Sequence, residues 1–190
     1  MPVNPNPQGK GLVPVLQGLQ QHWSRIQVPP KQIDQISVEL FTSLFILQSE
    51  FKFSPVPLRS YWLYQVRKRY RLLMVGPQEW HTPYPGRFIG RCRLQNDRTW
   101  TLDLDPLVAQ DEAFLATIEG QRRALEAELM QAPSLDEVMP GCIEALGYQG
   151  RALAYILGRS LRASMQLSGI HALTYSEAKG LLSFDNPEIP

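Results

Sequence analysis

A carboxylate and an imidazole lie two positions apart in this chain, one on each side of a tryptophan. Glu79, Trp80 and His81 fall in a loop bounded by Gly76-Pro77 and Pro85-Gly86, residue pairs that interrupt strands. Glu79 and His81 are residue types that transfer protons, and an indole beside a carboxylate raises its pKa by desolvation. The loop is therefore a candidate for acid–base catalysis. We favour the alternative, in which Trp80 fills the core and Glu79 bonds to nearby backbone or arginine.

A second group of residues is suited to binding rather than to chemistry. Predicted strands at 60–66 and 70–75 form a hairpin around Arg67-Lys68-Arg69, and a neighbouring strand carries more arginines. Small sheets bind nucleic acid when aromatic side chains stack on bases and Lys or Arg contact phosphates. The isoelectric point near 7.8 favours the alternative, a solvated hairpin tip whose positive charges are balanced by acidic residues that follow in the chain. The candidate binding residues are Arg67, Lys68, Arg69, Arg71, Arg91, Arg93, Tyr61 and Trp80.

Other patterns that carry chemistry are not found in the sequence. The histidines His22, His81 and His171 are isolated, and no cluster of Cys, His or carboxylate has the spacing of a metal site. The two cysteines, Cys92 and Cys142, give no disulfide framework. We expect no metal and no cofactor. The sequence identifies no reaction, and we lean towards a protein without enzymatic activity.

The elements that position these residues follow from hydrophobic periodicity. Apolar residues recur at three- and four-residue steps on both sides of the central region, which is typical of amphipathic helices. Between residues 51 and 105, short apolar and aromatic stretches alternate with turn-forming residues, which predicts strands. We expect an α+β fold with a four- or five-stranded antiparallel sheet, open or curled into a small half-barrel, packed by N- and C-terminal helices. The predicted organisation is a flexible arm (1–10), a single domain (11–169) with helices 12–27 and 31–50, strands 51–105 and helices 107–169, and a mobile tail (170–190).

The second predicted hairpin has a pattern that defines its register. In both of its strands the even-numbered positions are mostly apolar and the odd-numbered ones mostly polar. The two apolar sets share a face only if paired residue numbers sum to an even number, which favours a three-residue loop at Asn96-Asp97-Arg98. Leu94 then pairs with Trp100, and Arg91 with Asp103. Such a cross-strand ion pair contributes a few tenths of a kcal/mol up to about 1 kcal/mol.

Composition and charge bound the class of protein. With 190 residues, 44% of them hydrophobic, the chain can bury a core without disulfides or metals. Its longest apolar run, at 41–47, is far shorter than the roughly 20 residues of a membrane helix, and residues 1–7 do not resemble a signal peptide. We therefore expect a cytoplasmic protein that does not enter a membrane. The net charge is +8 over residues 51–100 and −8 over residues 101–150, a division that favours association between charged surfaces.

Several short motifs in the strand region resemble those of a known family. They occur in the order Phe51-Lys52-Phe53, Tyr61-Trp62-Leu63-Tyr64, Pro77-Gln78-Glu79-Trp80 and Asp97-Arg98-Thr99-Trp100. Their order resembles an uncharacterised family, known only as a domain of unknown function, over about residues 51–105. The family implies no activity, and His81 stands where its pattern has Gly.

These observations favour a non-enzymatic cytoplasmic interaction module whose contact surface is the basic hairpin and the Arg-lined sheet face. The acidic segment 111–131 either covers that face or meets it in another chain, so a protein partner or self-association is expected. One alternative is a nucleic-acid-binding protein that uses the same residues. Another is a small-molecule enzyme centred on Glu79 and His81.

Overall fold

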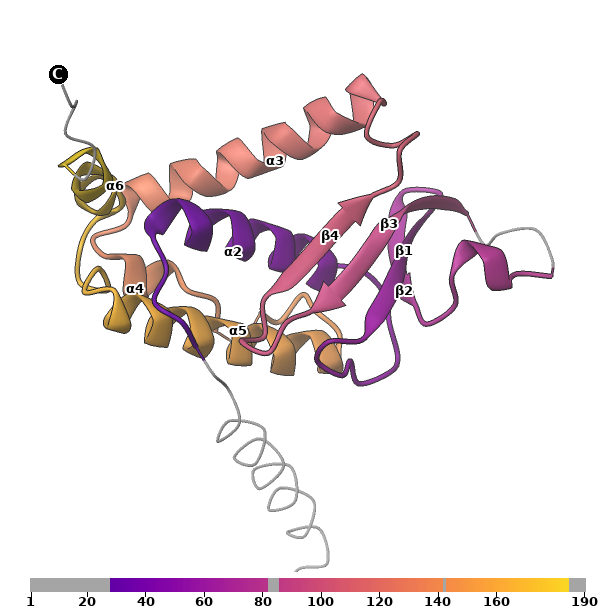
Figure 1. The fold of residues 1–190 in the computed structure, drawn as a ribbon, viewed down its shortest axis with the longest axis horizontal. Helices are drawn as coiled ribbons and strands as arrows, with labels where there is room; N and C mark the ends of the chain where they lie inside the picture. Colours follow the sequence, from indigo (N-terminus) through magenta and orange to yellow (C-terminus); the bar gives the residue numbers. More distant parts are fainter. Residues whose placement is uncertain (1–27, 82–85, 142, 185–190) are drawn as a thin grey trace, which may run out of the picture.

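The computed structural model describes residues 28–81, 86–141 and 143–184, and has the expected α+β architecture (Figure 1). In Figure 1, α2 runs between α3 and α5, with the sheet at one end of the molecule and α6 at the other. The expected arm (1–10) and first helix (12–27) lie outside the described residues. The elements are α2 (Ile33–Leu47), β1 (Ser60–Val66), β2 (Arg69–Leu73), the short 3-10 helix η2 (Pro77–Glu79), β3 (Arg87–Leu94), β4 (Trp100–Leu104), α3 (Glu112–Gln131), α4 (Leu135–Val138), α5 (Tyr148–Leu167) and α6 (Tyr175–Phe184).

Helix α2 joins two hydrophobic cores because it is apolar on more than one side. Ile36 and Leu40 pack with residues of α4, α5 and α6 in the first core. Phe45 and Ile46 pack with the sheet in the second core, beside Trp100. Each fully buried side chain of this kind stabilises the fold by about 1.5–3 kcal/mol. The helix therefore couples the sheet to the C-terminal helices.

The sheet is open, has four strands in the order β2-β1-β3-β4, and is antiparallel throughout. The predicted register of the second hairpin is confirmed, since Leu94 pairs with Trp100 and Arg91 with Asp103. The three-residue loop closes with Arg98 at a φ of 69°, the left-handed conformation expected at the end of such a loop. The inner face is therefore apolar and the outer face carries the arginines of β3.

The first hairpin is tighter than predicted. Val66 pairs with Arg69, so the turn contains only Arg67 and Lys68, and Arg69 belongs to β2. Arg67 takes a φ of 57°, which a two-residue turn requires. The stretch around Phe51, expected to begin the extended region, forms no strand of the sheet and contributes a single parallel bridge between Glu50 and Arg71.

The C-terminal region contains α3, α4 and α5 within the range 107–169 where helices were expected, and α6 beyond it. The expected mobile tail from residue 170 is corrected by α6, which begins at Tyr175. Tyr175 and Ala178 are buried in the first core, because they lie three residues apart on one face of that helix. Among the described helices, none is long and apolar enough to cross a membrane.

Candidate functional site

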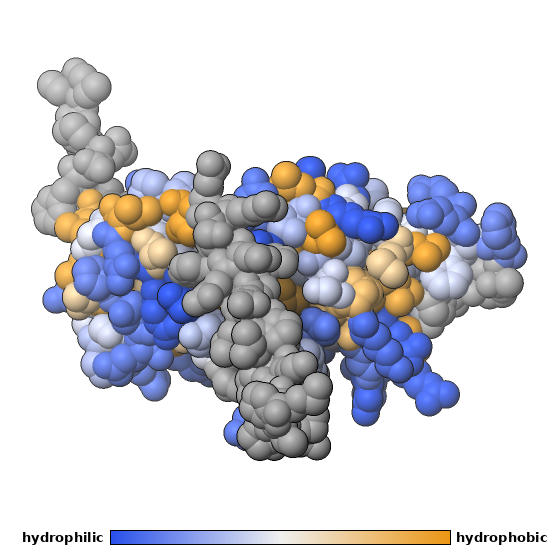
Figure 2. Space-filling view, turned by 90° about the horizontal axis from the view of Figure 1, so that it is seen from below, coloured by the Kyte–Doolittle hydropathy of each residue, from blue (hydrophilic) through white to orange (hydrophobic). Residues whose placement is uncertain are grey.

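Basic side chains gather around the tip of the first hairpin and line two adjoining concavities of about 800 and 650 Å³. The two concavities share Glu50, Lys68 and Arg69, and the second is also lined by residues 145–147, just before α5. Figure 2 shows long hydrophilic side chains standing off the surface at the end of the molecule that holds the sheet. We call this group the basic recess; it consists of Lys52, Arg67, Lys68, Arg69, Arg71 and the single acid Glu50.

The backbone holds Glu50 beside the two arginines of β2. The Glu50 N–H donates to Tyr70 O at 2.8 Å, and the Leu72 N–H donates to Glu50 O at 3.1 Å. Arg69 and Arg71 are two positions apart in a strand and therefore point to the same face. Arg69 Nη1 lies 2.8 Å from Glu50 Oε1, and Arg71 Nε lies 3.4 Å from Glu50 Oε2. One carboxylate thus orients both guanidinium groups.

The recess keeps unused donors and unpaired charge. The hydrogen bond from Arg69, followed by the charges of Arg69 and Arg71, holds the pKa of Glu50 below its usual range. Each guanidinium has five N–H donors, and the contact with Glu50 engages only part of this set. Arg67 and Lys68 are exposed, and within the described part of the chain their side chains have no ion-pair partner. The net formal charge of the recess is therefore strongly positive.

The arginines of the sheet face each have a hydrogen-bond or ion-pair partner within the protein. Arg91 Nη2 lies 3.2 Å from Asp103 Oδ2, as expected from the register. Arg93 Nε donates to Leu58 O at 3.0 Å. Asp111, the N-cap residue of α3, forms an ion pair with Arg87 at 2.7 Å. Two acids within α3, Glu119 and Glu126, pair with Arg122 or Arg123 of the same helix. On this face Arg91 and Arg87 are therefore paired with carboxylates, whereas Arg93 is held by a backbone carbonyl and keeps its charge.

The aromatic members of the predicted binding set are not displayed on the recess. Tyr61 is 1% exposed, its ring lies 5.1 Å from that of Phe53 and 5.8 Å from that of Trp100, and its hydroxyl accepts from the Val56 N–H at 2.7 Å. Trp80 is half-buried, and its Nε1 donates to the Tyr64 hydroxyl at 3.1 Å. Tyr61 is thus a core residue, and Trp80 packs against Tyr64 of β1 and does not line either concavity.

In the loop that suggested acid–base chemistry, the Glu79 side chain bonds to backbone. Glu79 is exposed, and its Oε1 accepts from the Gly76 N–H at 2.9 Å, which closes the short 3-10 helix η2. His81 is also exposed and borders residues outside the described ranges. The bond from Glu79 to backbone agrees with the structural interpretation of this loop, whereas Trp80 is half-buried rather than within the core.

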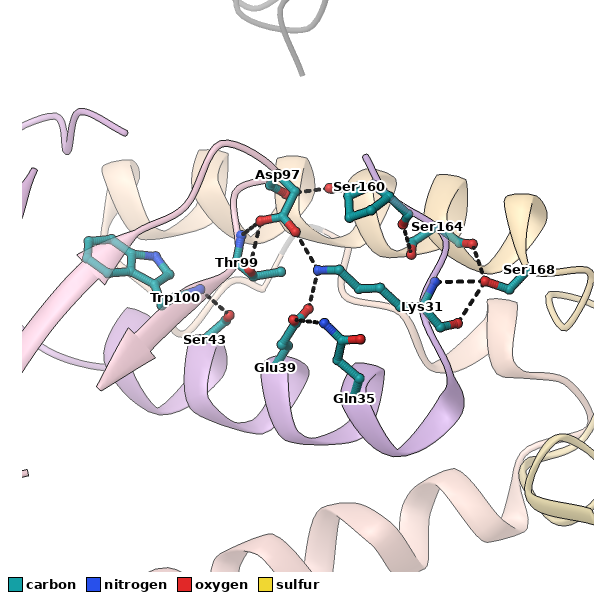
Figure 3. Close-up of polar contacts among 11 residues, drawn as sticks. Lys31, Gln35, Glu39, Ser43, Asp97, Thr99, Trp100, Ser160, Ser164 and Ser168 are labelled. Atoms are coloured by element: carbon teal, nitrogen blue, oxygen red, sulfur yellow. Dashed lines mark hydrogen bonds and ion pairs between the residues drawn. The ribbon is translucent and has the colours of Figure 1, made fainter. Parts of the chain in front are cut away.

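A buried polar cluster that the sequence did not reveal lies between α2, α5 and the β3–β4 loop (Figure 3). Lys31, whose side chain is 3% exposed, donates from Nζ to Glu39 and to Asp97. The other carboxylate oxygen of Asp97 accepts from the Thr99 N–H at 3.2 Å and the Thr99 hydroxyl at 2.7 Å. Ser160 on α5 donates to the Asp97 carbonyl. The cluster ties the β3–β4 loop to both α2 and α5.

Lys31 precedes α2, whose N-cap residue Gln32 has extended backbone, so helical spacing does not relate Lys31 to Glu39 and no local signal marked the pair. Their partner Asp97 comes from a distant hairpin loop, so its part in the cluster could not be inferred. The cation and the two carboxylates satisfy one another, which indicates a structural role.

Other candidate groups in the described ranges do not form a reactive site. Burial raises the pKa of the Cys92 thiol, which lies in the sheet core. Cys142 falls outside the described residues. Within residues 28–81, 86–141 and 143–184, no set of three or more His, Cys, Asp or Glu side chains is placed to hold a metal ion.

In a comparison with known proteins, part of the chain matches one protein family. Residues 31–118 match the family described as "Protein of unknown function (DUF2452)", which agrees with the resemblance to an uncharacterised family. The match spans α2, the whole sheet and the first part of α3. No curated protein and no solved structure matches the chain.

Proposed function

We propose that this chain, whose sheet and α2 match a family of unknown function, is a non-enzymatic binding module for an acidic segment of a partner protein. The contact surface is the basic recess at the tip of the first hairpin. The proposal includes a cytoplasmic location, which is supported by the free thiol of Cys92.

One observation carries this proposal. Arg67 and Lys68 stand exposed at the tip, within a concave group of five cations and one carboxylate. The sheet face differs, because Arg91 is paired with Asp103 and Arg93 is a single cation held against a backbone carbonyl, so the face has no comparable cluster of unpaired cations among the described residues. Charge that is unpaired within the chain is available to a partner, and it gives both attraction and orientation during association.

A protein partner is favoured over a single-stranded nucleic acid by the position of the aromatic rings. Sequence-tolerant binding of single strands relies on exposed aromatic side chains on which bases stack. Tyr61 is buried, while Tyr70 is half-buried and packs edge-on against Phe45 at 4.9 Å. Among the residues that line the two concavities, Phe51 and Tyr70 are the aromatic ones, and both are partly buried.

A second copy of this chain can supply the acidic segment. Residues 124–150 contain five carboxylates and no Lys or Arg. Among them Glu128, Glu137 and Glu144 are exposed. Light scattering during size-exclusion chromatography distinguishes this case, because an oligomer held by such contacts dissociates as added salt screens them.

We expect Arg67→Ala/Lys68→Ala to weaken binding of a fluorescently labelled oligoglutamate peptide by roughly tenfold at low salt. Each exposed ion pair contributes up to about 1 kcal/mol, and the change removes two cations without touching the core. Fluorescence anisotropy over a salt series measures the affinity, and the wild-type protein should lose it steadily as salt is raised.

Arg59→Ala is the matched control. Arg59 is also an exposed cation, but it precedes β1 and so lies about 20 Å along the strand from the hairpin tip. It should leave the affinity nearly unchanged. Equal losses in both variants, or tighter binding of an oligonucleotide than of the peptide, would contradict the proposed protein-binding site.

A further inference from the structure

The two arginines of β2 are arranged differently from the lysine and arginine of the turn. Arg69 and Arg71 project from the same face of one strand and share Glu50, whereas Arg67 and Lys68 have no such partner within the described residues. Glu50 is itself held by two backbone hydrogen bonds to β2, of 2.8 and 3.1 Å. The arginine pair is therefore oriented before any ligand arrives.

Orientation of this kind suits a ligand with several oxygen atoms at one point. A guanidinium group is a planar fork that binds carboxylate or phosphate through two parallel hydrogen bonds, which an ammonium group cannot do. Arg69 and Arg71 each keep N–H groups outside the contact with Glu50. With Lys68 and Arg67 they line one concavity of about 800 Å³ that has Glu50 as its acid.

The positive charge of this concavity is larger than one carboxylate side chain can neutralise. Four cations and one carboxylate line it, so its formal charge is +3. A phosphate monoester carries about −1.5 to −2 charges at neutral pH and three acceptor oxygens, whereas Asp or Glu carries −1 and two. A phosphodiester of nucleic acid carries one charge per phosphate and spreads its charges along a strand.

We propose that the concavity around Arg69, Arg71 and Lys68 binds a phosphoryl group on the acidic segment of the partner protein. This inference rests on the proposed function and adds the chemistry of the recognised group. Glu50 is a positioning residue, Arg69 and Arg71 supply the forks, and Lys68 adds charge. Arg67, which lines the same concavity, contributes to attraction.

Three labelled peptides of one acidic sequence test the proposal, with Ser, Glu or phosphoserine at a single central position. For wild-type protein we expect the phosphoserine peptide to bind roughly tenfold more tightly than the Glu peptide in an anisotropy titration. The variant Arg69→Lys/Arg71→Lys keeps both charges but loses both forks. It should abolish most of this preference and change the affinity for the Glu peptide by less than about twofold.

Arg91→Lys serves as the control, since Arg91 is exposed on β3 and paired with Asp103. Equal affinity for the phosphoserine and Glu peptides, or a preference that survives in Arg69→Lys/Arg71→Lys, overturns the inference while the charge-dependent binding module stands. Failure of all three peptides to bind overturns both. Tighter binding of a phosphodiester oligonucleotide than of the phosphoserine peptide assigns the site to nucleic acid and also overturns the inference.

Discussion

Lys31→Met is expected to lower the free energy of unfolding by about 3–5 kcal/mol, because it leaves buried carboxylates without their cation. The side chains of Lys31, Glu39 and Asp97 are 3%, 19% and 10% exposed, so water cannot replace the lost ammonium group at Asp97 without rearrangement. The β3–β4 loop would also lose its attachment to α2. Urea denaturation followed by circular dichroism measures the change.

The triple variant Lys31→Met/Glu39→Gln/Asp97→Asn distinguishes lost charge balance from lost packing. Removing the whole ion cluster at once is often close to neutral, since no uncompensated charge remains. We expect the triple variant to recover most of the stability that Lys31→Met loses. If the triple variant were as unstable as the single one, charge compensation would not explain the effect.

Acid stability should depend on the same cluster. Burial raises the pKa of Asp97, but hydrogen bonds from Lys31 and Thr99 and the charge of Lys31 outweigh it, so its folded pKa lies below the usual value. The unfolded chain, with an Asp pKa of about 3.9, therefore binds the proton first as pH falls. The stabilisation from Asp97 is complete above that pH and is lost as pH falls through the folded pKa. In Lys31→Met, the urea midpoint should fall less steeply with pH over this window.

Gly158→Ala is expected to destabilise the protein by an amount near the upper end of the roughly 1–3 kcal/mol typical of overpacking. A Cβ at Gly158 would lie 1.8 Å from Pro140 O, so α5 or the chain at Pro140 must move. Hydrogen bonds from α5 also hold the segment before Pro140 in place, since Arg162 Nη2 donates to Met139 O at 2.9 Å and to Asp136 O at 3.1 Å. Thermal and urea unfolding of the purified variant give the size of the loss.

Gly120→Ala is the matched comparison, because Gly120 also lies inside a helix but has nothing within 4 Å of its added Cβ. Alanine is a better helix former than glycine by about 1 kcal/mol, so this variant should be more stable than wild type. A stable Gly158→Ala protein would mean that α5 does not pack against residues 136–140 as described.

The sheet was largely predictable from its alternation of apolar and polar residues. In the second hairpin, the apolar residues of both strands have even numbers, so pairing Leu94 with Trp100 places both apolar sets on one face. This register also pairs Arg91 with Asp103. The first hairpin was less well predicted because apolar residues lie on both of its faces, so alternation could not define the turn. The predicted turn, Arg67 to Arg69, is therefore one residue longer than the observed turn of Arg67 and Lys68.

The features that were missed depend on contacts between distant segments. Its local sequence marks Asp97 only as a turn residue, whereas its bond to Lys31 joins positions 66 residues apart. The role of Glu50 depends on a single bridge outside the sheet, which no local pattern marks. The segment 170–190 resembles a mobile tail because it closes the chain and ends in the turn-forming Asp185-Asn186-Pro187, although Tyr175 and Ala178 of α6 are buried by packing against the first core. Of the predicted binding residues, the hairpin cations are brought together, whereas Tyr61 is a core residue.

The most direct test of the central claim is a nuclear magnetic resonance titration of ¹⁵N-labelled protein with the acidic peptide. We predict that the backbone shifts change at residues 50–52 and 66–71, which surround the basic recess, and that the changes shrink as salt is added. Shifts centred on the outer face of β3 and β4, or on Glu79 to His81, would contradict this account. So would the absence of any change at low salt.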